Sequence, residues 1–103
     1  MDLNSKNFQD TLKNNKVVMV DFWAAWCGPC RALTPTITEL EKEFLDTAVV
    51  AKVNVDEEPQ IAAALSVRAM PTIVIFKEGI EVERLVGMSP KSTYSDKINY
   101  YLN

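Results

Sequence analysis

The sequence predicts an α/β fold in which helices flank both faces of a central mixed β-sheet. Segments with the apolar spacing of helices alternate along the chain with segments rich in the β-branched and aromatic residues of strands. Residues 17–23 are apolar on both faces of a strand, which is typical of the interior of a parallel sheet. Glu78-Gly79 separates two later strand-like segments, which indicates an antiparallel hairpin.

The expected order is helix, strand, helix, strand, helix, strand, strand, helix, with right-handed crossovers where helices join parallel strands. Ser5 can cap the first helix, in which Phe8 and Leu12 lie on one face. The second helix begins at the cysteine motif and runs to about Leu45, and Pro35 inside it is expected to kink it. The strands are expected at 17–23, 48–55, 72–77 and 80–86, a short helix after Pro59 and the last helix after Pro90.

Length and charge exclude several classes of protein. A chain of 103 residues fits a single domain over residues 1–103. A net charge of −3 without a basic stripe excludes nucleic-acid binding and a polybasic membrane patch. No apolar run is long enough to span a membrane, and residues 1–6 lack the apolar core of a secretory signal. We therefore expect a soluble, cytoplasmic protein, unless a signal was removed before residue 1.

The chain has few residues that bind transition metals, with two cysteines and no histidine. A closed tetrahedral zinc site needs four nitrogen or sulfur ligands, so we expect no zinc site within one chain. A cluster that two chains share, with two thiolates from each, stays open. No other cofactor is expected.

Both cysteines lie in one stretch, Trp26-Cys27-Gly28-Pro29-Cys30, directly after the first strand. Cysteines three positions apart in the first turn of a helix can form a disulfide. The helix N-terminus favours the reactive thiolate, most of all at Cys27, which we expect to be the more exposed of the two. Cys30 can then resolve a mixed disulfide. Gly28 allows a substrate backbone to approach, and Pro29 stiffens the loop.

The simpler alternative is a disulfide that only staples the fold. Closing so short a loop contributes only about 2 kcal/mol in the chain-entropy model. An intracellular setting would also keep such a disulfide reduced. These arguments favour a redox function for the cysteine pair.

Asp21, Lys52 and Pro71 have open roles when they are interpreted from the residues alone. A lone carboxylate in a strand that is apolar on both faces should have a raised pKa, so Asp21 could exchange a proton with a nearby thiol. It could equally meet solvent or a backbone amide at the strand end. Lys52 could pair with Asp21 from a neighbouring strand, although a surface lysine is the simpler explanation. Pro71 begins a strand, where a trans proline is unremarkable.

A longer, ordered set of residues resembles the thioredoxin family. Residues 20–31 resemble the active-site segment of the family, and further matches cover nearly the whole chain. These further matches are Pro35 and residues 52–56, 67–72, 76–79 and 86–87. The resemblance implies the thioredoxin fold, with four to five strands. It also implies a protein-disulfide reductase that NADPH-dependent thioredoxin reductase recycles, contributing to cell redox homeostasis.

The resemblance further implies a chemical role for individual residues. Cys27 would be the nucleophile and Cys30 the resolving thiol of a redox-active disulfide. Asp21, assisted by Lys52, would carry the proton of Cys30. Pro71 would be a cis-proline beside the sulfur atoms.

The resemblance also implies how partners bind. The partners would be thioredoxin reductase and disulfide-containing client proteins, and the protein would be a monomer. The Met70 backbone would pair with an extended client segment, and Trp23 would pack beneath the site. Gly28 and Pro29 would in addition tune the redox potential. The contact surface would comprise Trp26, Gly28, Pro29, Met70, Pro71, Gly87 and Met88.

Three departures from the family pattern and two competing functions accompany this interpretation. Only residues 1–3 precede the first helix, so we expect the first edge strand to be shortened or absent. Arg31 stands where lysine is frequent and keeps the charge, and Met70 stands where a branched residue is common, which would loosen client selectivity. The competing functions are an exported oxidase or isomerase of the same fold and a binding module with a vestigial redox site.

Overall fold

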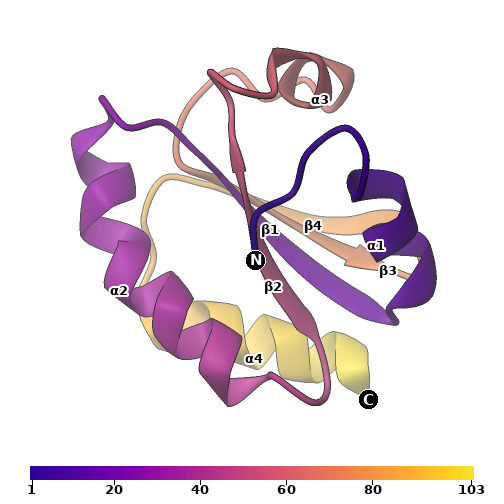
Figure 1. Ribbon diagram of the computed structural model, residues 1–103. Helices are drawn as coiled ribbons and strands as arrows, with labels where there is room; N and C mark the ends of the chain where they lie inside the picture. Colours follow the sequence, from indigo (N-terminus) through magenta and orange to yellow (C-terminus); the bar gives the residue numbers. More distant parts are fainter.

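The structure, a computed structural model, describes all 103 residues. One mixed sheet has the strand order β2-β1-β3-β4, and helices pack against both of its faces (Figure 1). None of the helices combines the length and apolar character needed to cross a membrane. The elements are α1 (Phe8–Asn14), β1 (Val17–Trp23), α2 (Gly28–Glu43), β2 (Val49–Asn54), α3 (Pro59–Ala64), β3 (Thr72–Lys77), β4 (Ile80–Val86) and α4 (Lys91–Leu102). This order is the predicted one, and the α/β class is confirmed.

Strand β1 lies inside the sheet, where nearly all of its side chains are buried. It pairs in parallel with β2 and antiparallel with β3. The prediction of a parallel-sheet interior is therefore wrong on one side of the strand. Burial on both faces requires only that helices cover both faces, and an antiparallel neighbour can be covered in the same way. Consequently only α2 connects two parallel strands that pair with each other.

Side chains of β1 point alternately into two hydrophobic clusters, as the period of a strand requires. Val17 and Met19 pack in the cluster that includes side chains of α2 and α4. Val18, Val20 and Phe22 pack in the cluster that includes side chains of α1 and α3. Figure 1 shows α2 and α4 running close together on one side of the sheet, away from α1.

The N-terminal edge strand is reduced to a single bridge. Asp2 pairs in parallel with Lys52 as an isolated β-bridge. The Leu3 N–H donates to the Lys52 carbonyl at 2.8 Å, and the Lys52 N–H donates to the Met1 carbonyl at 2.8 Å. We expected this strand to be shortened or absent, and the structure shows that it is shortened. The bridge satisfies part of the edge of β2.

The start of the first helix differs from the prediction. Helix α1 begins at Phe8, and its N-cap Asn7 makes no side-chain capping bond. The turn before it is held by Asn4, whose Oδ1 accepts the N–H groups of Lys6 and Asn7 at 2.8 and 3.1 Å. Short amide side chains bond the local backbone readily, and here Asn4 does so in place of Ser5. The cap predicted at Ser5 is wrong.

The second helix and strand are slightly shorter than expected. Helix α2 ends at Glu43 rather than near Leu45, because Phe44 has left the helical conformation as its C-cap. Pro35 lies within α2 as predicted, and the expected kink stays a prediction. Strand β2 also falls one residue short of the predicted strand at each end.

The predicted turn between β3 and β4 is confirmed. Glu78 and Gly79 have φ values of 52° and 82°, and Lys77 pairs with Ile80 across the turn. Positive φ at both central residues is the type I′ pattern that suits the twist of a hairpin, and it favours glycine. The hairpin makes β4 the second edge of the sheet.

We expect Leu40→Ala to destabilise the fold by about 3 kcal/mol, because Leu40 is completely buried between α2 and the sheet and its loss leaves a cavity. Leu45→Ala is the matched control, since Leu45 is 73% exposed and its truncation should cost less than about 0.5 kcal/mol. Urea unfolding of both oxidised variants measures the difference. Equal losses would contradict this core assignment.

Candidate functional site

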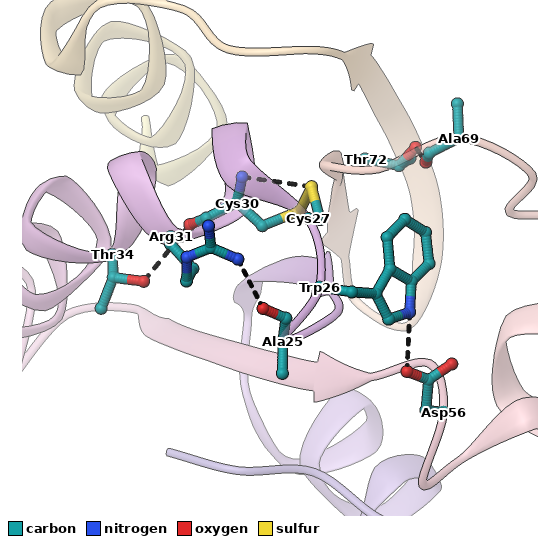
Figure 2. Close-up of a disulfide and its surroundings, with 9 residues drawn as sticks. All are labelled: Ala25, Trp26, Cys27, Cys30, Arg31, Thr34, Asp56, Ala69 and Thr72. Carbon is teal, nitrogen blue, oxygen red and sulfur yellow. Dashed lines mark hydrogen bonds between the residues drawn. A yellow bond between two sulfur atoms is a disulfide. The ribbon is translucent and has the colours of Figure 1, made fainter.

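The two cysteines form a disulfide at the junction of β1 and α2 (Figure 2). Cys27 is the N-cap of α2 and Cys30 lies in its first turn, with their Cα atoms 5.3 Å apart. The Cys27 Sγ accepts the N–H of Cys30 at 3.2 Å. The positive end of the helix therefore faces the Cys27 sulfur and favours negative charge on it.

Both cysteines are buried, but not equally. Cys27 is 6% exposed and Cys30 is 1% exposed, so the expectation that Cys27 is the more accessible is confirmed in direction. Ala24 is buried with them, and Trp23 and Met70 pack against the pair. A sulfur atom of another molecule therefore reaches Cys27 before it can reach Cys30.

Two hydrogen bonds hold the loop before the cysteines (Figure 2). The indole Nε1 of Trp26 donates to Asp56 Oδ2 at 2.9 Å. Trp26 is 65% exposed. The Arg31 Nη1 donates to the Ala25 carbonyl at 2.7 Å. The sequence gives Arg31 only a charge and gives Asp56 no individual role. No local pattern could have revealed these contacts, although both residues lie inside the stretches that resemble the family.

The segment before β3 forms a second side of the site. The Met70–Pro71 peptide bond is cis, as the resemblance implied. Pro71 is buried, and its carbonyl accepts the N–H of Gly87 at 2.8 Å. The Thr72 hydroxyl donates to the carbonyl of Ala69 in the same turn (Figure 2). The Gly87 bond brings the end of β4, and with it the exposed Met88, to this segment.

Asp21 lies on β1, on the face of the sheet that α2 covers. It follows Met19 in the alternation of β1 and is only 2% exposed. Its Oδ1 has no hydrogen-bond partner. Burial raises the pKa of Asp21 from its ordinary 3.8 to about 7, and the positive charge of Lys52 opposes this rise. Such a carboxyl group can take up and release a proton near neutral pH.

Lys52 occupies the position beside Asp21 in the parallel β1–β2 pair. Its Nζ lies 5.4 Å from the centre of the Trp23 ring, a cation–π arrangement. Lys52 therefore lies next to Asp21, but the two side chains form no ion pair, and Lys52 is only half-buried. The catalytic roles of Asp21 and Lys52 remain predictions.

The cysteine pair lies outside every pocket of the structure. The hollows are lined by other residues, and one of them lies between α1 and α3 with Phe8 and Ile61 in its lining. Nor do three side chains of the kinds that bind metals gather at any point. Because small ligands are usually enclosed by concave sites, this surface suits a large partner better than a small molecule.

The thioredoxin family model matches residues 1–100 of the chain. The chain belongs to the thioredoxin family. It is 43% identical to thioredoxin from Pyropia yezoensis over 92% of this chain and 89% of that protein. It is also 44% identical to the chloroplastic M-type thioredoxin of Spinacia oleracea, over 99% of this chain and 57% of that protein.

A solved structure agrees with this assignment. A mutant thioredoxin from Halobacterium salinarum superposes with a TM-score of 0.91 at 37% identity, covering 100% of this chain and 90% of that one. The thioredoxin fold is therefore confirmed. With the Cys27–Cys30 disulfide, membership of the family makes the protein a dithiol/disulfide oxidoreductase that acts by thiol–disulfide exchange.

The raised pKa of Asp21 predicts how stability depends on pH. The folded protein binds this proton more tightly than the unfolded chain, so the stabilisation from protonation is complete below pH 3.8 and is lost as pH rises to about 7. A pKa raised from 3.8 to about 7 corresponds to about 4 kcal/mol at about 1.4 kcal/mol per pH unit. Asp21→Asn cannot ionise and should be more stable than the unsubstituted protein above pH 7, by up to that amount.

Urea unfolding of the two oxidised proteins at about pH 5 and about pH 8 measures this difference. The stability gap should be much larger at the higher pH. If the stability difference between the two proteins were the same at both pH values, the pKa of Asp21 would not differ between the folded and unfolded states, which would contradict the raised pKa.

Proposed function

We propose that the protein reduces disulfides in other proteins and that NADPH-dependent thioredoxin reductase then reduces its own disulfide, contributing to cell redox homeostasis. The observation that carries the proposal is the Cys27–Cys30 disulfide at the N-terminus of α2, in an open surface. We also propose that it acts as a monomer in the cytoplasm. The chloroplastic name of the spinach relative makes the compartment a question for cell fractionation.

The first step forms a mixed disulfide. The Cys27 thiolate attacks one sulfur of the client disulfide, and the other client sulfur leaves as a thiolate that takes up a proton. The charge on Cys27 is supported by the helix N-terminus and by the N–H of Cys30. Cys27 suits this step because it is the more exposed of the pair.

The second step releases the client. Asp21 accepts the proton of the Cys30 thiol, and the Cys30 thiolate attacks the Cys27 sulfur. The Cys27–Cys30 disulfide forms and the second client sulfur leaves with a proton, so two electrons pass from the dithiol to the client. A carboxyl group with a pKa of about 7 suits this transfer because it gives and takes protons near neutral pH.

The client would bind by surface contact rather than in a cavity. Trp26 and Met88 present exposed apolar side chains, and Met70 is half-buried beside the cysteines. Exposed apolar residues around a reactive group commonly mark an interaction site. We assign the Met70 backbone to pairing with an extended client segment, with Pro71 and Gly87 beside it.

We expect the reduced protein to cleave the disulfides of insulin, and NADPH with a thioredoxin reductase to sustain the reaction. Cys27→Ser should abolish it, because the attacking sulfur is gone. Cys30→Ser should still attack but stop at the mixed disulfide, which is detected by mass as a covalent adduct. Leu45→Ala, at an exposed position just after the end of α2, is the control and should keep full activity. Lack of both activities in the intact dithiol form would contradict the proposal.

Asp21→Asn should slow the resolution step about tenfold or more and flatten its pH dependence, because the proposed acceptor of the Cys30 proton is removed. Stopped-flow measurement of the decay of the mixed disulfide across neutral pH tests this. The urea unfolding of this variant, which is expected to be more stable than the unsubstituted protein, first shows that it is folded. Unchanged rates at every pH would rule out Asp21 as the proton carrier.

A further inference from the structure

The segment that links β4 to α4 is held at both ends. We call residues 87–89 the Met88 loop. At its start Gly87, with a φ of 87° that favours glycine, donates its N–H to the Pro71 carbonyl at 2.8 Å. At its end Ser89 donates its N–H to the hydroxyl of Tyr94 at 2.9 Å. Met88 lies between these two bonds with half of its surface exposed.

Tyr94 is a completely buried residue of α4, in the hydrophobic cluster shared with α2 and the sheet. A buried tyrosine hydroxyl needs a hydrogen-bond partner, and the Ser89 N–H supplies one. The bond serves both groups, because the Ser89 N–H has no other acceptor.

The positions of the two residues explain what the bond does. Ser89 directly precedes the N-cap, and Tyr94 is the fourth residue of the helix. Apolar side chains at these two positions often pack together and set the direction in which the chain enters a helix. Here a hydrogen bond from the backbone of Ser89 to the Tyr94 hydroxyl takes the place of that apolar contact, so it sets the path of the Met88 loop.

We propose that Tyr94 is a positioning residue whose hydroxyl holds the Met88 loop in the conformation that binds client proteins. The inference rests on the proposed function, because it requires that this loop touches clients. A loop that is already ordered loses less conformational entropy when a client binds. Removing the hydroxyl therefore weakens client binding.

The chemical step lies outside the reach of this hydroxyl. The cysteines are positioned by the start of α2, and Asp21 and Lys52 lie on β1 and β2. The single hydrogen bond of the Tyr94 hydroxyl goes to the loop. A small disulfide, which needs only access to Cys27, should react equally fast with and without it.

The test compares Tyr94→Phe with Tyr101→Phe. Both variants remove one hydroxyl from α4 and keep the ring. The Tyr101 hydroxyl bonds at the far end of the helix, donating to the Val82 carbonyl at 3.3 Å or to Glu83 Oε1 at 3.1 Å. Each reduced protein is mixed in a stopped-flow instrument with increasing excess of insulin, and separately with 5,5′-dithiobis(2-nitrobenzoic acid). The insulin series separates an apparent Kd from a limiting rate constant.

For Tyr94→Phe we expect the apparent Kd for insulin to rise about fivefold, the size expected for one lost hydrogen bond. The limiting rate constant and the rate with the small disulfide should not change. Hydrogen exchange at the Ser89 amide should become faster, while amides of β1 keep their protection. Tyr101→Phe should match the unsubstituted protein in every one of these measurements.

Several results would overturn the inference. An unchanged Kd for insulin together with faster exchange at Ser89 would show that the order of the loop does not matter to clients. Unchanged exchange would show that the hydroxyl does not hold the loop. An equal decrease in the rate of reaction with the small disulfide would indicate that the hydroxyl has a general structural role. Failure of the unsubstituted protein to reduce insulin would contradict the proposed function and the inference together.

Discussion

The rest of the structure depends on the burial of β1 on both faces. Because this strand is covered by α2 and α4 on one side and by α1 and α3 on the other, neither layer of helices can move without exposing its side chains. The end of β1 also fixes where α2 starts, and so where Cys27 lies. The same constraint buries Asp21, the one charged residue of the strand. Core and chemistry are thus set by one element.

Under the proposed mechanism, stability and function oppose each other at Asp21. A carboxyl group buried in an apolar layer with an unbonded oxygen disfavours its charged form, which costs folding free energy at neutral pH. The same cost brings its pKa close to 7, where proton exchange with a thiol is most useful. Lys52 moderates the effect from the neighbouring strand. An apolar residue at this position would stabilise the core better but could not exchange a proton.

Hydrogen bonds between distant segments build the surface around the cysteines. Asp56 holds Trp26 from the end of β2, and Arg31 holds Ala25 from α2. Pro71 and Tyr94 hold the two ends of the Met88 loop. The loop before the cysteines, the segment at Pro71 and the Met88 loop are therefore held in place by the rigid sheet and helices behind them. This arrangement keeps a reactive sulfur near the surface without leaving its surroundings loose.

The α/β class, most element boundaries and the redox chemistry could be predicted from the residues alone, because they follow from local periodicity, turn residues and the spacing of Cys27 and Cys30. Asp21 was a candidate, but its burial and neighbours depend on how β1 and β2 pair, and Pro71 was unremarkable until a resemblance was considered. The structure confirmed the cis bond that the resemblance implied before Pro71. The antiparallel pairing of β1 with β3 and the contacts of Asp56 and Tyr94 became apparent only in the folded chain. These features join segments far apart in the chain, and no local pattern of residues encodes which distant groups will meet.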